Sequence, residues 1–119
     1  MNYEKLNVWQ QSVHLSAVLY KYLKPLKDYG FKDQITRSGL SVASNIAEGM
    51  ARYSIKEKAH FLAIAKGSCA ELRTQIYIGI EIGYIEQAIG LTWLQNASSI
   101  DAMLTGLRNK ILKQNLASK

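Results

Sequence analysis

Cysteine, proline and long apolar runs are all scarce in this chain of 119 residues. Cys69 is the single cysteine, which excludes the intramolecular disulfide framework of small secreted domains. Pro25 is the single proline, which is few for a chain with many loops. No apolar run reaches the roughly 18 residues that a membrane-spanning helix needs, and the first residues lack the pattern of a secretory signal. We therefore expect one cytoplasmic domain over residues 1–119.

Acidic side chains are also few in comparison with basic ones. Lysine and arginine total 15 against 9 aspartates and glutamates, so the formal net charge is +6. Apolar residues make up 48% of the chain, which is enough to fold around a single core without a cofactor. A positive balance of this kind favours a polyanionic partner.

Motifs for metals and cofactors are missing too. His14 and His60 fall in different segments, and neither belongs to a zinc-binding pattern. The glycines form no phosphate-binding loop, so we expect neither a metal nor a nucleotide cofactor. Cys69 lies beside a predicted core face, where a thiol acts as a small apolar group.

Helical patterns account for nearly the whole chain. We predict helices over residues 7–24, 33–51, 55–82 and 91–114. Asn7 with Gln10 predicts a capped start for the first helix, and Ser54 with Glu57 predicts a capping box for the third. Pro25 ends the first helix. Because the connections are short, the sequence predicts an all-α, antiparallel up-down-up-down four-helix bundle.

Apolar spacing predicts which helix faces are buried. The fourth helix has one apolar stripe, formed by Trp93, Ala97, Ile100, Leu104, Leu107 and Ile111. The same arithmetic on the third helix selects Phe61, Ile64, Ala65, Ser68, Leu72, Gln75, Gly79 and Ile82. We interpret both stripes as the core of the bundle.

The first helix has two apolar faces, although a helix of an isolated bundle needs only one. We assign one face to the core: Leu6, Trp9, Val13, Ala17 and Tyr20. We interpret the opposite face as a homo-oligomer interface: Val8, Leu15, Leu19 and Tyr22. The alternative is that loops bury this helix more deeply.

A line of short polar side chains follows one face of the second helix. It consists of Gln34, Ser38, Ser41, Asn45 and Glu48 and continues to Arg52. We interpret it as a structural polar network, with Glu71 on the third helix as a further member. A catalytic pair of Glu48 and Glu71 is the alternative, but no nucleophile or metal set accompanies these carboxylates. We therefore expect no enzyme activity and no catalytic residues.

Basic side chains gather on the third helix and at one end of the predicted bundle. Lys66, Arg73 and Tyr77 line up on the outer face of the third helix with small residues between them. The connection between the second and third helices lies at the same end as the last turns of the fourth. The predicted nucleic-acid contacts are Arg52, Lys56, Lys58, Lys66, Arg73, Arg108, Lys110 and Lys113. The alternative is an ordinary solvated surface.

Several short motifs resemble a known family. They are Leu6–Gln10, Tyr29–Phe31, the stretch from Ser41 through Asn45–Gly49 to Arg52, Phe61–Ala65, Gly67–Ser68 and Glu71–Leu72. The chain resembles, over nearly its whole length, the four-helix bundle family encoded in intervening sequences of bacterial 23S rRNA genes, also labelled S23 ribosomal protein. That family is similar to the accessory variability proteins of diversity-generating retroelements, which form pentameric barrels with a basic surface.

The resemblance implies a homopentamer that binds nucleic acid, and it implies no catalytic residues. Two positions depart from the family pattern. Lys32 stands where a Ser or Thr cap is usual, so the cap of the second helix would pass to Asp33. Gly39 replaces the more usual alanine in the middle of a helix, which costs about 1 kcal/mol unless close packing offsets it.

The sequence thus supports two functional hypotheses. The first is a non-enzymatic, self-assembling accessory protein that binds RNA or DNA backbone with weak sequence preference. The alternative is a protein–protein adaptor or scaffold, for example for a reverse transcriptase, that has no direct contact with nucleic acid.

Overall fold

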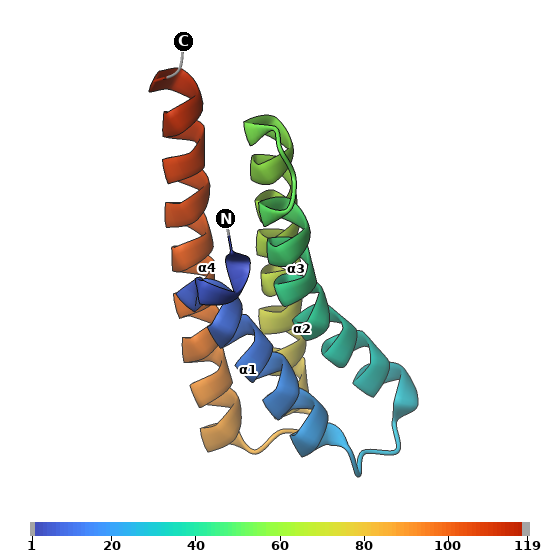
Figure 1. Ribbon diagram of the computed structural model, residues 1–119. Coiled ribbons are helices and arrows are strands. Elements are labelled where there is room, and N and C mark those ends of the chain that lie inside the picture. Colours follow the sequence, from blue (N-terminus) through green and yellow to red (C-terminus); the bar gives the residue numbers. More distant parts are fainter. Residues whose placement is uncertain (1, 118–119) are drawn as a thin grey trace.

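Four helices form an antiparallel bundle in the computed structural model, which describes the backbone of residues 2–117 and the side chains of residues 2–114 (Figure 1). A short 3-10 turn, η1, precedes them. The elements are η1 (Tyr3–Lys5), α1 (Asn7–Leu23), α2 (Tyr29–Met50), α3 (Ile55–Glu81) and α4 (Gln87–Ala117). Consecutive helices run in opposite directions and pack side by side, and α1 closes the bundle against α4. The predicted up-down-up-down topology is confirmed.

The first helix is much shorter than the others. It has 17 residues, whereas α2, α3 and α4 have 22, 27 and 31. Figure 1 shows that α1 spans only the half of the molecule near the α1–α2 and α3–α4 connections, which we call the four-helix end. The opposite half contains the α2–α3 turn and the last turns of α4, and we call it the three-helix end.

Of the three predicted helix caps, only one is present in the structure. The Ser54 hydroxyl accepts the Glu57 N–H at 2.9 Å, which confirms the predicted cap of α3. The Asn7 cap is wrong, because Leu6 is the cap residue and the Asn7 side chain bonds Gln11 instead. The Asp33 cap is also wrong, because the Asp28 carboxylate accepts the Phe31 N–H at 3.1 Å and α2 begins at Tyr29.

The core stripe of α4 is confirmed, and that of α3 is displaced around the helix. Trp93, Ile100 and Leu104 are buried as predicted. On α3, however, Ile64 and Ile82 are exposed, and the fully buried line is Leu62, Ala65, Cys69, Leu72 and Ile76. Four members of the predicted stripe are nevertheless buried, namely Ala65, Ser68, Leu72 and Gly79, so the two lines overlap. The helix α3 packs between α2 and α4. Apolar spacing alone could not distinguish the buried line from its neighbour.

The two faces of α1 are largely the reverse of those predicted, although Leu6 and Trp9 pack against the core as expected. Val8, Leu15 and Leu19 lie in the core of the protomer, so the proposed oligomer interface is wrong. The fourth member, Tyr22, is half-buried, and its hydroxyl accepts the Glu86 N–H at 3.0 Å. Val13 and Tyr20, which were assigned to the core, are 39% and 48% exposed.

Close packing explains the glycine in the middle of α2. A Cβ at Gly39 would lie 2.7 Å from Leu19 Cδ1, and Leu19 is fully buried in α1. The absence of a side chain therefore lets α1 and α2 approach each other, which offsets the low helix propensity of glycine.

Candidate nucleic-acid interface

A hydrogen-bonded seam joins the middle of α2 to α3. The Ser41 hydroxyl bonds the Ser68 hydroxyl at 2.9 Å. The Asn45 amide donates to the Ser41 carbonyl and hydroxyl at 2.8 and 2.9 Å. One turn further on, a Cβ at Gly49 would lie only 2.9 Å from Phe61 Cβ. This stretch of α2 therefore holds two helices in register and close together.

The remaining members of the predicted polar network have more local roles. The Ser38 hydroxyl donates to the Gln34 carbonyl at 3.0 Å, within its own helix. Glu48 forms an ion pair with Arg52, one turn along the same helix. Glu71 is exposed and forms no hydrogen bond or ion pair with the residues described. The network is thus present at Ser41 and Asn45 but does not extend to Glu71.

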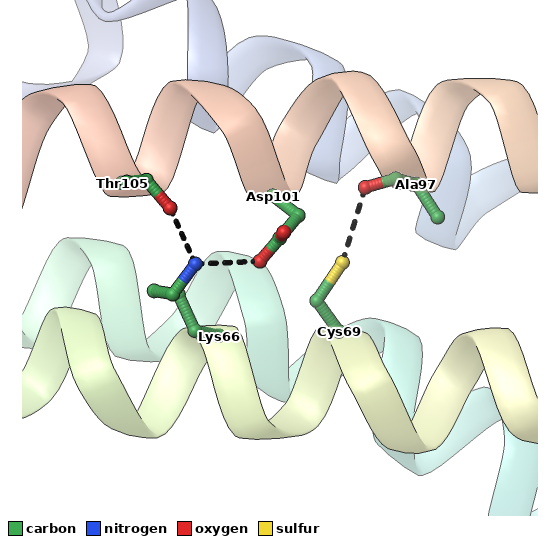
Figure 2. Close-up of polar contacts among 5 residues, drawn as sticks. All are labelled: Lys66, Cys69, Ala97, Asp101 and Thr105. Carbon is green, nitrogen blue, oxygen red and sulfur yellow. Dashed lines mark hydrogen bonds and ion pairs between the residues drawn. The ribbon is translucent and has the colours of Figure 1, made fainter.

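Four of the eight predicted nucleic-acid contacts also have partners within the fold. Lys58 Nζ donates to the Met50 carbonyl at 3.1 Å, at the end of α2. Arg108 Nε donates to the Ala59 carbonyl at 3.1 Å and so ties α4 to α3. Lys66 lies in the α3–α4 seam and bonds Asp101 at 2.8 Å and the Thr105 hydroxyl (Figure 2). The fourth is Arg52, paired with Glu48.

The other four divide by exposure. Lys56, Lys110 and Lys113 are exposed, and all three lie at the three-helix end. Arg73 is half-buried in the middle of α3, and its buried Nε has no hydrogen-bond partner among the residues described. The structure therefore does not unite the eight cations in one patch: it places six at one end and Lys66 and Arg73 further along α3.

Charge is distributed unevenly between the two ends. The three-helix end carries six cations and two carboxylates: Arg52, Lys56, Lys58, Arg108, Lys110 and Lys113 with Glu48 and Glu57. The four-helix end carries five cations and four carboxylates: Lys21, Lys24, Lys27, Lys32 and Arg37 with Asp28, Asp33, Glu81 and Glu86. The electrostatic potentials of neighbouring opposite charges largely cancel each other. The three-helix end, which has the larger excess of cations, is therefore the more positive surface.

Cys69 is a structural thiol. Its side chain is buried between α3 and α4, and Sγ donates to the Ala97 carbonyl at 3.3 Å (Figure 2). Burial raises the pKa of the thiol to about 11, and the nearby Asp101 carboxylate adds to the shift. The thiol is therefore protonated and a poor nucleophile at neutral pH.

Within residues 2–117, no three histidine, cysteine or acidic side chains gather closely enough to hold a metal ion. None of the helices in the described part is both long and apolar enough to cross a bilayer.

One exposed aromatic residue escaped the sequence analysis. Tyr53 lies in the α2–α3 turn, beside the cations of the three-helix end. The sequence could have predicted this exposure, because Tyr53 falls between Arg52 and Lys56 in a connection between two helices. An aromatic ring in a short polar turn does not reach the core.

Together these features define a basic four-helix bundle with a polar α2–α3 seam and one cationic end. Residues 4–106 match the family described as 23S rRNA-intervening sequence protein, and the chain belongs to that family. A crystal structure of a protein of unknown function from the S23 ribosomal protein family of Bacteroides thetaiotaomicron superposes with a TM-score of 0.80. It is 24% identical, and the match covers 85% of this chain and 97% of that one. A comparison with curated proteins gave no match.

Proposed function

We propose that this protein is a non-enzymatic, self-assembling accessory protein of the cytoplasm that binds the phosphate backbone of nucleic acid through its three-helix end. The observation that supports this most is the uneven distribution of charge, because the three-helix end carries six cations and only two carboxylates. Lysine and arginine contacts to phosphates supply affinity without reading base sequence. We therefore propose weak sequence preference.

The hydrogen bonds and ion pairs within the fold determine which cations are free to contact phosphates. Lys56, Lys110 and Lys113 have exposed side chains and meet the phosphates first. Arg108 uses Nε for the Ala59 carbonyl, which leaves its terminal amino groups for a phosphate. Lys66 contributes little, because Asp101 neutralises it in the α3–α4 seam.

Exposed apolar side chains on α1 and α2 support the self-assembly part of the proposal. Val13, Tyr20 and Leu40 are each about two-fifths to one-half exposed, and we call them the α1–α2 outer face. Leu40 follows Gly39, the point at which α2 packs against α1. A second copy of this chain would cover the face, and the pentamer implied by the family resemblance would repeat the cationic end several times. Repetition raises the apparent affinity for a long polyanion.

The test compares two triple variants that remove the same charge from opposite ends. One is Lys56→Gln, Lys110→Gln, Lys113→Gln, and the control is Lys21→Gln, Lys24→Gln, Lys27→Gln; all six lysines are exposed. Binding to a fluorescent single-stranded RNA and to an RNA hairpin is measured over a series of salt concentrations. We expect the first variant to lose at least about tenfold in affinity and its salt slope to fall by about 2 units, since each lost contact to a single strand lowers it by about 0.7.

Two results would count against the proposal. Equal weakening by both triple variants would mean that only net charge matters and not the three-helix end. Failure of the wild-type protein to bind either RNA at low salt would exclude the nucleic-acid role and favour the alternative adaptor role.

A further inference from the structure

Tyr53 is the most exposed large apolar side chain in the described part of the protein, at 101% relative accessibility. Aromatic side chains usually bury a large area against their neighbours. Even Tyr29, the next most exposed, is 64% accessible and lies beneath the Lys32 ammonium. The Tyr53 ring therefore contributes nothing to the core and stands free in water.

The backbone that carries this ring is held firmly on both sides. The Arg52 N–H bonds the Gly49 carbonyl at 3.1 Å, which ends α2. The Ser54 hydroxyl accepts the Glu57 N–H, which starts α3. The α2–α3 turn lies at the three-helix end (Figure 1). Its backbone is held on both sides of Tyr53, so little backbone entropy remains to be lost when the ring meets a ligand.

Cations flank the ring on both sides in the sequence. The Arg52 guanidinium lies over the Phe61 ring at 4.8 Å and is paired with Glu48. Lys56 is exposed in the first turn of α3, and Glu57 beside it is the opposing charge there. An exposed aromatic ring between cations can stack on a nucleobase while the cations contact the neighbouring phosphates.

We propose that Tyr53 is a stacking platform for an unpaired base, so that the three-helix end binds single-stranded nucleic acid in preference to duplex. This inference rests on the proposed function. In a duplex every internal base is already stacked, and a ring projecting from a turn can only meet its edges and backbone. In a single strand the faces of the bases are available, and stacking tolerates any sequence because every base has a flat face.

The experiment uses three variants of the full chain and two RNA ligands. Tyr53→Ala removes the ring, Tyr53→Phe keeps it, and Tyr29→Ala removes an exposed ring from the four-helix end. Each is titrated into a single-stranded RNA containing 2-aminopurine, whose fluorescence reports stacking, and into a blunt RNA duplex of equal length. Because Tyr53 is fully exposed and Tyr29 is 64% exposed, we expect all variants to fold, as checked by circular dichroism.

We expect Tyr53→Ala to weaken single-strand binding by roughly fivefold to 150-fold and to abolish the 2-aminopurine signal, since stacking is worth about 1–3 kcal/mol per base. Duplex affinity and the salt slope should not change, because no charge is lost. Tyr53→Phe and Tyr29→Ala should behave like the wild type.

Two outcomes would overturn the inference. If Tyr53→Ala binds single strands as the wild type does, or weakens both RNAs equally, the ring does not stack on a base, whereas the backbone-binding proposal survives. If the wild-type protein binds neither RNA, both proposals fail.

Discussion

Asp28 connects two loops through a single side chain. One carboxylate oxygen caps α2 by accepting the Phe31 N–H, and the other accepts the Tyr84 hydroxyl at 2.8 Å. The α1–α2 and α3–α4 connections are thereby joined at the four-helix end. The hydrogen bond from the Phe31 N–H, with a smaller contribution from Tyr84, holds the pKa of Asp28 below its usual value. The hydrogen bond between the two side chains raises the pKa of Tyr84.

The lowered pKa predicts a specific pH dependence of stability. A carboxyl whose pKa is lower in the folded state adds stability above its unfolded pKa and loses it as the pH falls through the folded value. We expect Asp28→Ala to lower the melting temperature by a constant amount near neutral pH, and this difference should narrow below about pH 4. Thermal unfolding followed by circular dichroism measures it, with the exposed Asp33→Ala as the control. A difference that does not vary with pH would show that the charge of Asp28 is not involved.

Single residues were predictable only where the local sequence contained both partners. Ser54 and Glu57 are three residues apart, and the cap that they predict is present. Asp28 and Asp33 look alike as caps in the sequence, and the contact that distinguishes them comes from Tyr84, 56 residues away. No local rule could have chosen between the two aspartates.

At the scale of helices, Gly49 marks the close approach of α2 and α3. A Cβ there would lie 2.9 Å from Phe61 Cβ and 3.3 Å from the Lys58 carbonyl oxygen. Neither atom lies at the end of a flexible side chain, so the helices themselves would have to separate. Together with the Ser41–Ser68 hydrogen bond, this gives a packing reason for the most distinctive stretch of the sequence, from Ser41 to Gly49.

This packing predicts opposite effects of the same substitution at two glycines. Gly49→Ala should destabilise the protein by about 1–3 kcal/mol, because the added methyl group overpacks the seam. Gly67→Ala should stabilise it by up to about 1 kcal/mol, since nothing lies within 4 Å of a Cβ there and alanine favours the helix. Urea unfolding curves measure both. If Gly49→Ala were as stable as the wild type, α2 and α3 would lie further apart than described.

The existence and order of the helices and the buried face of α4 followed from the sequence, whereas the rotations of α1 and α3 did not. On α1, both Val8–Leu15–Leu19 and Val13–Tyr20 are apolar, so periodicity shows two faces without showing which one is buried. Gly39 is the residue of α2 that distinguishes the two faces, because α1 packs against it through Leu19. This distinction becomes readable only once the partner helix is placed.

At the scale of the whole molecule, the cationic end was predictable from topology. The short connections fix which helix ends lie together, and the sequence fixes which of those ends carry lysine and arginine. The internal partners of Lys58, Lys66 and Arg108 were not predictable, because Met50, Asp101 and Ala59 meet them only through helix packing. The prediction from the sequence therefore overestimated how many of the eight cations are free to contact nucleic acid.

Self-assembly is a property of the whole molecule, and its test changes with the burial of α1. We expect Leu15→Glu to unfold the protomer, because it places an unpaired charge in the core. The double variant Val13→Glu, Tyr20→Glu should keep the helical circular dichroism of the wild type and sediment as a monomer. Analytical ultracentrifugation distinguishes the cases. If the wild-type protein sediments as a monomer, or if the double variant forms the same oligomer as the wild type, the α1–α2 outer face is not an oligomer interface.

The contact between α1 and α4 has a consequence for synthesis on the ribosome. Neighbouring helices can pair as soon as each one emerges, but α1 meets α4 through contacts such as Asn7 with Met103, 96 residues later. At translation rates of about 5–20 residues per second, the α4-facing side of α1 waits roughly 5–20 s for its partner. We therefore expect the nascent chain to form an open layer of three helices in which the α4-facing side of α1 is exposed, and the docking of α4 to be the step that shields that side from chaperones.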